Sequence, residues 1–442
     1  ISCLLAGAFR QKGERMPIAG LALIGLAGAG AASVLLWGRR AESFGVVVAD
    51  EFGLFITLVL VAIGILTVVL SSGVLERDGL PVGEYYGLTL FAIAGMMLMA
   101  VANDLLIIFL ALETFSLSVY VLTGMRRDRQ QSTEAAFKYF LLGAFSSGFF
   151  LYGIAFIFGL TGSTSLDSIG TAVAARAMTS NPLLLVGMGL LIVGFGFKVA
   201  AVPFHMWTPD AYEGAPTMVT GFMSTAVKAA AFAAFVRVFL SALEPLRADW
   251  MPVLWALAML TMILGTVVGV AQTNLKRMLA YSSIAHGGYL LVAMVSANEV
   301  GKASILFYLA VYAVTNLGAF AVIALLSERD HPREELNDYK GLWHTHPGMS
   351  ALLAVFLLSL GGFPPMAGFV AKWYVFSAAV RSGEYALAIV GVLTSVVSVF
   401  FYLRVVVMMY MTEREEGAVA GPHPPKMATA ALALSVLVIL YL

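Results

Sequence analysis

Apolar runs of about 20 residues, the length that crosses a bilayer as an α-helix, recur along the whole chain. The composition agrees, since 60% of the 442 residues are apolar and 12% are charged, whereas a soluble domain carries roughly a quarter charged residues. A soluble globular enzyme is therefore excluded, and we expect an all-α polytopic membrane protein. The predicted spans lie near 17–37, 52–75, 86–102, 104–123, 135–160, 183–203, 215–240, 252–271, 276–297, 301–326, 347–380 (interrupted), 384–409 and 425–442.

The two ends of the chain are themselves apolar. Residues 1–9 are too short for a complete signal peptide and are interpreted as the remnant of a first helix. We therefore expect a chain trimmed at both ends, with about fourteen transmembrane helices and no soluble domain. Its longest polar connections are predicted at 161–182, 327–346 and 410–424.

The distribution of basic residues predicts the orientation. With the remnant counted as the first helix, connections on one side hold 14 of the 26 Lys and Arg and those on the other side hold 6. Basic connections stay in the cytoplasm, so the N-terminus is expected outside. The richer side holds Arg10, Lys12, Arg15, Arg77, Arg126, Arg127, Arg129, Lys276, Arg277, Arg329, Arg333, Lys340, Arg414 and Lys426, and the other holds Arg39, Arg40, Arg176, Arg247, Lys302 and Arg381.

Several classes of chemistry are excluded or disfavoured. Cys3 is the single cysteine, whereas an all-thiolate iron–sulfur cluster needs four. Neither a P-loop nor a dinucleotide-binding glycine motif occurs, and the loop histidines His344 and His346 have few neighbouring candidate ligands. The 26 acidic residues balance the 26 basic ones, so nucleic acid is not an expected partner. We expect no bound cofactor and no metal in this chain.

Charged residues inside the predicted spans are the candidate functional residues, because a charge at the bilayer centre costs about 2.5–3.5 kcal/mol on insertion scales. Glu113 lies about 13 Å along its helix from Asp104, and Lys228 about 18 Å from Pro216, at 1.5 Å per residue in a core of roughly 30 Å. Both are near mid-membrane. The basic residues within spans are Lys138, Lys198, Lys228, Arg237, Lys372 and Arg404.

Two of these lysines lie beside predicted helix breaks. Lys198 precedes Pro203 by five residues in GFGFKVAAVPFHMWTPDAYEGAP, and Lys372 follows Pro365 by seven in LGGFPPMAGFVAKWYVF. Irregular backbone at membrane depth is tolerated where it is buried in protein or lines a cavity, and paired interrupted helices indicate a transport path.

The lysines are 174 positions apart, and the same offset takes Glu113 to 287, next to His286. It takes Lys228 to 402, near Arg404. We therefore predict two five-helix repeats, 86–240 and 252–409, the second inverted, preceded by helices in 1–85 and followed by 425–442.

Structural interpretations remain open for these residues. Glu113 could form a structural ion pair, and Lys198 and Lys372 could bind carbonyls freed by the breaks. The stem of Lys138 could extend to the interface. His205 and His286 could relay protons or be hydrogen-bonded core histidines. Structural or anchoring roles are also expected for Arg237, Arg404, Lys276 and Arg277.

Five segments together resemble a known family: ALETFSLSVYVL, STEAAFKYFLLGAFSSGFFLYG, GFKVAAVPFHMWTPDAYEGAPT, NLKRMLAYSSIAHGGY and GGFPPMAGFVAKWYVF. They are similar to the antiporter-like subunits of respiratory complex I, the proton-pumping NADH:quinone oxidoreductase. HMWTPDAYEGAP and Lys372 make the chain most similar to the N-type chains, counterparts of mitochondrial ND subunit two. The resemblance covers nearly the whole sequence.

The resemblance implies fourteen helices in two inverted five-helix repeats, with two discontinuous helices. By it, Glu113 pairs with Lys198, Lys228 links the halves and Lys372 faces the exit of a proton path, while Lys138 and His205 fall on family positions. It further implies a translocase subunit in a bacterial inner membrane, with a periplasmic N-terminus. The implied partners are M-, L- and K-type chains and phospholipids; NADH, FMN, iron–sulfur clusters and quinone would bind partner subunits.

Two other functions stay open at this point. The multisubunit Na⁺/H⁺ antiporters share this fold and would need no redox partner. A structural spacer would transmit movement between neighbouring subunits without conducting protons. In every case the chain itself is expected to carry no redox centre.

Overall fold

The computed structural model describes residues 1–9, 17–175, 181–329, 332–413, 422 and 424–442. Within these ranges, eleven helices have the length and composition to cross a membrane. This confirms the all-α polytopic fold, while a total of fourteen spans stays a prediction. The α-helices are α1 Ser2–Phe9, α2 Ile18–Leu35, α3 Glu51–Arg77, α4 Val82–Val101, α5 Leu105–Thr123, α6 Gln130–Thr161, α7 Leu166–Ala175, α8 Pro182–Val199, α9 Trp207–Gly214, α10 Thr217–Phe222, α11 Lys228–Arg237, α12 Arg247–Val270, α13 Leu275–Ser296, α14 Glu299–Leu326, α15 Pro347–Gly361, α16 Ala367–Arg381, α17 Tyr385–Tyr410 and α18 Lys426–Tyr441.

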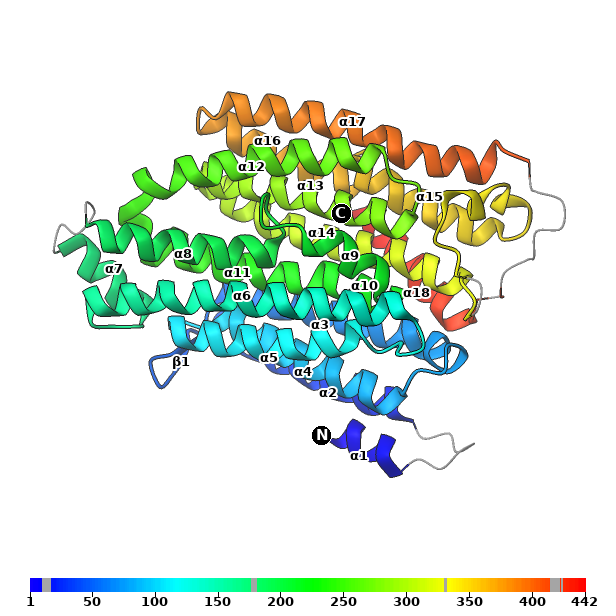
Figure 1. Cartoon of the computed structure of the whole chain (residues 1–442), viewed down its shortest axis with the longest axis horizontal. Coiled ribbons are helices and arrows are strands. Elements are labelled where there is room, and N and C mark those ends of the chain that lie inside the picture. The colour runs from blue at the N-terminus through cyan, green and yellow to red at the C-terminus, as the bar shows by residue number, and fades with distance from the viewer. Residues whose placement is uncertain (10–16, 176–180, 330–331, 414–421, 423) are drawn as a thin grey trace.

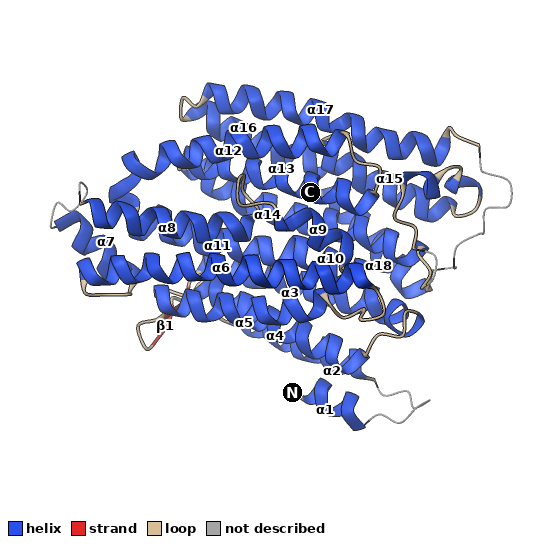
Figure 2. Cartoon of the chain, in the orientation of Figure 1, coloured by secondary structure: helices blue, strands red, loops and turns tan. Residues whose placement is uncertain are grey.

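Two features were not predicted from the sequence. The strands β1 Ala41–Ser43 and β2 Val47–Ala49 form an antiparallel hairpin before α3, which Figure 2 shows at one edge of the helices. The connection expected at 161–182 contains α7, whose Leu166, Ile169 and Val173 are buried. Strands of three residues and a helix of ten are too short to give a clear periodic signal.

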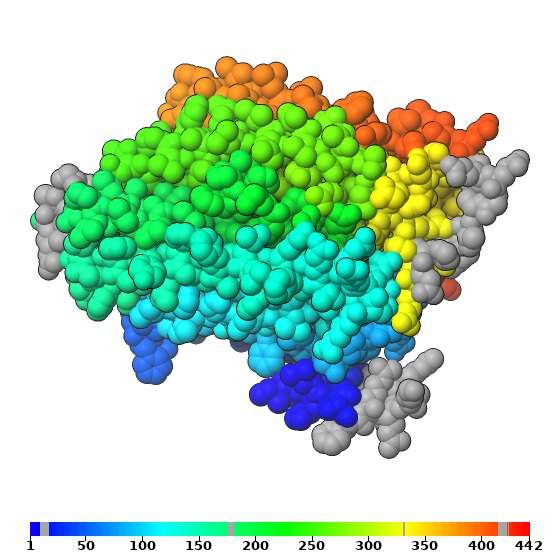
Figure 3. All heavy atoms as spheres, in the orientation of Figure 1, coloured from blue at the N-terminus to red at the C-terminus, as the bar shows by residue number. Residues whose placement is uncertain are grey.

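The long helices lie side by side, with α2–α5 towards one edge and α12, α13, α16 and α17 towards the other (Figure 1). In the space-filling view, colours run from blue through cyan and green to orange across the same face (Figure 3). The interior is formed by the helical stretch 217–242, α13 and α14. In the most apolar 18-residue window of each, 89–94% of the residues are buried. By contrast, α6 and α17 are each only 33% buried there.

Both predicted helix breaks are confirmed. Helix α8 ends at Val199, followed by Ala200 with φ +60°, and α9 begins at Trp207. Helix α15 ends at Gly361, followed by Gly362 with φ +84°, and α16 begins at Ala367. The peptide bonds preceding Pro203 and Pro365 are cis.

The geometry of the breaks does not reproduce the 174-residue offset. The helix ends before the two breaks, Val199 and Gly361, are 162 positions apart. The lysine spacing is longer because Lys198 belongs to the helix before its break and Lys372 to the helix after its break. The two lysines are therefore not equivalent by position, and His286 and Arg404 lose the argument that first selected them.

A matching pair of backbone contacts supports an internal repeat at a different spacing. Leu105 N donates to Thr164 O at 2.8 Å, and Leu275 N donates to Glu334 O at 2.6 Å, 170 positions later in both partners. Asp104 and Asn274, also 170 apart, cap the N-termini of α5 and α13. The domain boundaries 1–85, 86–240, 252–409 and 425–442, and the inversion of the second repeat, remain predictions.

The two arginines inside the spans have structural contacts. Arg237 binds the Asp50 carboxylate with both terminal nitrogens, at 2.8 and 2.7 Å. Arg404 donates to the carbonyls of Val270 and Gln272 at the end of α12. Both contacts agree with the structural interpretation.

Five basic residues counted for the orientation lie outside the described residues, namely Arg10, Lys12, Arg15, Arg176 and Arg414.

Candidate proton-transfer site

Lys198 lies in the last turn of α8 with 2% of its surface exposed. Its Nζ donates to Ser116 Oγ at 2.8 Å and to Tyr120 Oη at 3.3 Å, both on α5. Four aromatic rings surround the ammonium at 5.4–6.0 Å from their centroids, which favours a cation through the negative ring faces. These rings, the aromatic cage, belong to Phe115, Tyr120, Tyr139 and Phe197.

The expected direct pair between Glu113 and Lys198 is not formed among the described contacts. Glu113 is half-buried on α5 and accepts a hydrogen bond from Ser147 of α6. Ser116, which binds Lys198, is three residues further along α5 and so lies on a neighbouring part of the same helix face. The carboxylate and the ammonium therefore belong to adjacent hydrogen-bonded groups and not to one ion pair.

Lys228 begins α11 in the buried interior and is 2% exposed. It follows a π-helical turn, η2 Met223–Val227, a distortion found often at functional sites. Its Nζ donates to the Ser283 carbonyl and, at 2.8 Å, to Ser283 Oγ on α13. The Tyr312 ring of α14 lies 5.5 Å away.

His286 lies about one turn after Ser283 on α13 and is hydrogen-bonded through both ring nitrogens. Nδ1 is 2.5 Å from Tyr308 Oη and Nε2 is 3.3 Å from Tyr402 Oη. The imidazole also packs 5.1 Å from the Tyr312 ring that faces Lys228. His286 is thus a hydrogen-bonded core histidine that also adjoins the surroundings of Lys228.

Lys372 lies in α16 and is 5% exposed. Its Nζ donates to the carbonyl of Gly361, the last residue of α15, at 3.0 Å and to Ser395 Oγ of α17 at 2.8 Å. The Tyr289 ring of α13 lies 5.4 Å from Nζ. The alternative that this lysine binds a carbonyl at a helix break is therefore correct for one of its two contacts.

Gly287 allows a close approach between the first two lysine sites. A methyl group there would lie 3.0 Å from the Val199 carbonyl, which follows Lys198 in the chain, and 3.6 Å from Lys228 Nζ. A side chain at this position would fill the space between them.

A small cavity lies between the surroundings of Lys228 and those of Lys372. Its volume is about 10 Å³, close to the minimum for one water molecule. Within the described part of the chain, the hydroxyls of Tyr312 and Ser359 have no hydrogen-bond partner. Both line the cavity, together with His286, Tyr308, Thr315 and Ala371, the neighbour of Lys372.

The remaining two predicted residues lie near the first break. Lys138 of α6 is 45% exposed at its side chain and pairs with Glu134 at 2.7 Å and with Asp210 of α9 at 2.9 Å. It is therefore held by two carboxylates. His205 is half-buried between α8 and α9, and its buried Nδ1 has no hydrogen-bond partner among the described residues. No described hydrogen bond joins His205 to a lysine.

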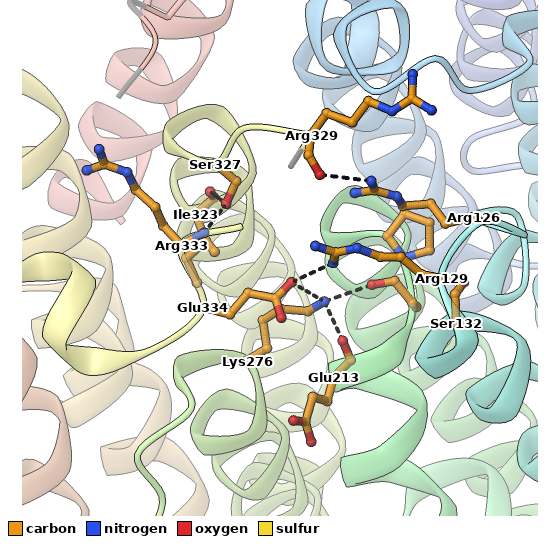
Figure 4. A network of polar contacts seen from close by, with 12 residues as sticks. Arg126, Arg129, Ser132, Glu213, Lys276, Ile323, Ser327, Arg329, Arg333 and Glu334 are labelled. Atoms are coloured by element: carbon orange, nitrogen blue, oxygen red, sulfur yellow. Dashed lines mark hydrogen bonds and ion pairs between the residues drawn. The ribbon is translucent and has the colours of Figure 1, made fainter. Parts of the chain in front are cut away.

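Lys276, expected to be an anchor at the membrane face, is 1% exposed. Its Nζ donates to the carbonyls of Glu213 and Ala215 at 2.6 and 2.8 Å and pairs with Glu334 at 3.2 Å (Figure 4). Arg129 approaches the same carboxylate at 3.8 Å. Lys276 therefore binds the end of α9 to the connection between α14 and α15.

Residues missed from the sequence are mainly uncharged. The hydroxyls of Ser116, Tyr120, Ser283 and Ser395 accept hydrogen bonds from the lysines, yet such residues are common in membrane helices and carry no distinguishing pattern. Within the described ranges, no group of three or more His, Cys, Asp or Glu side chains is placed to hold a metal ion.

Comparison with known proteins agrees with this geometry. Residues 102–398 match the family described as NADH:quinone oxidoreductase/Mrp antiporter, TM. NADH-quinone oxidoreductase subunit N of Trichlorobacter lovleyi is 49% identical, with 94% of this chain and 86% of the relative covered. The subunit N of Chloroflexus aggregans is 47% identical, with 93% and 85% covered.

Solved structures show the same similarity. A chain of respiratory complex I from Thermus thermophilus is 36% identical, with a TM-score of 0.84 over 100% of this chain and 94% of that one. A chain of the Mrp complex from a Dietzia species has a TM-score of 0.86 at 21% identity, over 99% and 92%, which shows the shared fold alone. The chain therefore belongs to the NADH:quinone oxidoreductase/Mrp antiporter family, and within it to the antiporter-like N subunits of NADH-quinone oxidoreductase.

Proposed function

We propose that this membrane-arm subunit moves protons through Lys198, Lys228 and Lys372, with Glu113 acting on the first of them. One observation carries the proposal: none of the three lysines is in a described ion pair, although each is at least 95% buried. A structural cation in a membrane normally pairs with a carboxylate or with backbone carbonyls, whereas each of these lysines also donates to a side-chain hydroxyl. Here the partners are hydroxyls, carbonyls and rings.

These partners suit a group that gains and loses a proton. A hydroxyl both donates and accepts, so it can bind an ammonium through its lone pair and a neutral amine through its hydrogen. In the structure Ser116 and Tyr120 accept a hydrogen bond from Lys198, Ser283 from Lys228 and Ser395 from Lys372.

The contacts support an order for the transfers. Because Gly287 has no side chain, the Val199 carbonyl next to Lys198 lies close to Lys228 Nζ. Beyond Lys228, the Tyr312 ring, His286 and the small cavity lead towards Ala371 and Lys372. Movement of the Glu113 carboxylate towards or away from Ser116 would change the proton affinity of Lys198. Lys138 and His205 are assigned to the approach to Lys198.

The wider setting is proposed from the family. The face that carries most basic residues lies in the cytoplasm, the N-terminus is periplasmic and the membrane is a bacterial inner membrane. The neighbours are M-, L- and K-type chains, with phospholipids between them. NADH, FMN, iron–sulfur clusters and quinone are bound by partner subunits, and quinone reduction there drives proton movement here.

Replacement of Lys228 by methionine tests the function. In inside-out membrane vesicles, proton uptake per NADH oxidised should fall strongly while the complex remains assembled on native gels, because methionine fills the site without exchanging a proton. Lys302→Met is the matched control, since Lys302 is exposed and paired with Glu299. Full proton uptake in assembled Lys228→Met complex contradicts the proposal.

The antiporter and the spacer make different predictions. Purification of the chain with flavin- and cluster-bearing subunits supports redox coupling, whereas purification without them supports a cation/proton antiporter. Unchanged proton stoichiometry in a triple variant of Lys198, Lys228 and Lys372 supports the spacer. The sequence identity to N subunits, 44–49%, favours redox coupling over the Mrp chain at 21%.

A further inference from the structure

A charged, half-open cavity lies between α6 and α9, near the basic face of the molecule. Its volume is about 140 Å³, enough for several water molecules. Gln131, Glu134, Lys138, Asp210 and Glu213 line it. The cavity brings water and ionisable groups to one side of the first helix break.

An aromatic pair lies beside residues that line this cavity and beside Lys198. Tyr139 follows Lys138 on α6, and Trp207 begins α9; both are at most 3% exposed. Their rings are stacked with centroids 4.2 Å apart and an interplanar angle of 2°. The Tyr139 ring belongs to the aromatic cage, 6.0 Å from Lys198 Nζ. One residue of α6 thus lines the cavity and the next contacts the proton carrier.

Of the two rings, Trp207 is hydrogen-bonded to the backbone next to Lys198. Trp207 Nε1 donates to the Phe197 carbonyl at 2.9 Å, and Phe197 is the residue before Lys198. The Tyr139 hydroxyl, by contrast, is buried and has no hydrogen-bond partner among the residues that the structure describes. A stacked ring with an unpaired hydroxyl is held by packing alone, so its displacement breaks no hydrogen bond.

Ion pairs fix α9, and with it Trp207, from the side of the cavity. Asp210 pairs with Lys138 at 2.9 Å and with Arg277 of α13 at 2.8 Å, and Glu213 pairs with the same Arg277 at 2.7 Å. The helix has eight residues and irregular backbone on both sides. Its orientation therefore depends strongly on these contacts.

We propose that Tyr139 and Trp207 form a gate that controls proton uptake from this cavity to Lys198, held closed by the ion pairs of Asp210. The gate rests on the proposed proton path and adds its uptake step. With the rings stacked, no water chain reaches Lys198. With the rings apart, water from the cavity reaches the ammonium and the proton exchanges.

Access of a reagent to position 198 tests the gate without requiring pumping. The chain carries Lys198→Cys and Cys3→Ala, is assembled in its complex in membrane vesicles, and is treated at the basic face with methanethiosulfonate ethylammonium; labelling of the 198 peptide is followed by mass spectrometry. Adding Tyr139→Ala should raise the labelling rate by about tenfold or more, the change given by a barrier about 1.4 kcal/mol lower. Tyr139→Phe keeps the ring and should leave the rate unchanged.

Phe150→Ala is the matched control, because Phe150 is a fully buried ring on the same helix outside the stack. Equal labelling with and without the Tyr139 ring, or an equal increase in Phe150→Ala, overturns the gate. Asp210→Asn keeps both rings and weakens the ion pairs, so it should give an intermediate increase. If Tyr139→Ala does not assemble, no increase in Asp210→Asn overturns the proposal. Failure of the proposed function would instead appear as full pumping without Lys228.

Discussion

The two lysines beside the helix breaks have different surroundings. Lys198 donates to two side-chain hydroxyls and is surrounded by four rings. Lys372 donates to one hydroxyl and to the Gly361 carbonyl, with a ring contact to Tyr289. A carbonyl accepts a hydrogen bond but has no proton to return. On the proposed proton path, Lys198 would therefore have two hydroxyls able to relay a proton, and Lys372 would have one such hydroxyl and one carbonyl that only accepts.

The difference follows from the side of the break on which each lysine lies. Lys198 ends the helix before its break, so its long side chain extends to hydroxyls and rings of the adjacent helices. Lys372 lies in the helix after its break and reaches back to the last carbonyl of the preceding helix. Similar sequence contexts thus give a lysine bound to side-chain hydroxyls in one half and a lysine bound to the backbone of the break in the other.

The largest effect is expected when each lysine is replaced by arginine. Arginine keeps the charge but does not release its proton in proteins, so both Lys198→Arg and Lys372→Arg should slow proton transfer by about 10²-fold, as for a lost acid–base group. Lys372→Arg should still assemble, because a guanidinium can bind the Gly361 carbonyl. Proton uptake per NADH oxidised measures the effect; normal uptake with either arginine would show that charge alone is needed there.

The aromatic cage can be disturbed without changing Lys198. A methyl group at Gly143 of α6 would overlap the Tyr120 hydroxyl, so Gly143→Ala should push that ring away, with a destabilisation of about 1–3 kcal/mol. Gly159→Ala on the same helix is the control, since nothing lies within 4 Å of its added methyl. Thermal dissociation of the purified complex and proton uptake measure the effect. Equal behaviour of both variants contradicts a tightly packed cage.

The relay hydroxyls give a smaller and unequal effect. Ser395→Ala removes the single hydroxyl that binds Lys372, whereas Ser116→Ala leaves Tyr120 bound to Lys198. A lost hydrogen bond is worth about 1 kcal/mol, so Ser395→Ala should slow proton uptake by about fivefold and Ser116→Ala by less. Initial rates of proton uptake compare the two. A larger loss in Ser116→Ala would reverse the contrast between the two sites.

The smallest effect is expected far from both lysines, at the Asp50–Arg237 pair. Partial burial by itself would raise the pKa of the Asp50 carboxyl. The hydrogen bonds and the charge of Arg237 outweigh this effect, so the pKa of Asp50 is lowered. Asp50→Asn keeps the helix-capping oxygen and removes the charge, so stability should fall by about 1 kcal/mol or less, with proton transfer unchanged. A change in proton uptake would link this pair to the path.

The pH dependence of the stability lost in Asp50→Asn follows from the direction of the Asp50 pKa shift. Because the pKa of Asp50 is lower in the folded protein, its stabilisation is present above the ordinary aspartate pKa and disappears as the pH falls through the folded value. Native protein and Asp50→Asn should therefore differ in thermal dissociation near pH 7 and converge in acid. A difference that persists in acid would exclude the ion pair as its cause.

Sequence reasoning predicted the helices and both breaks well, because hydropathy over 20 residues and clustered prolines are strong signals. It also identified the buried lysines, since a charge in an apolar run is conspicuous. It did not predict the contacts: the Glu113–Lys198 pair is absent from the described ion pairs, and Asp210, Tyr139 and Trp207 were not singled out. Their importance depends on where α9 turns after the break, which no local pattern specifies.

His286 stays a prediction, although the spacing that selected it is not the spacing of the structure. The 174-residue offset pointed to 287, but the helix ends before the two breaks are 162 positions apart and the matched backbone contacts 170. His286 nevertheless lies against Tyr312, which faces Lys228. Its place comes from packing between α13 and α14, and not from symmetry with Glu113.

The π-helical turn before Lys228 has a consequence for chain length. Such a turn closes hydrogen bonds over five residues where an α-turn closes them over four, so Met223–Val227 accommodates one residue more than a regular helix of the same height. Deleting one residue within 223–227 would convert the turn to α-helix and leave the two flanking segments in register. The same deletion within 228–237 would rotate the side chains that follow it on α11 by about 100°. A deletion of one residue should thus be tolerated just before the central lysine and be disruptive just after it.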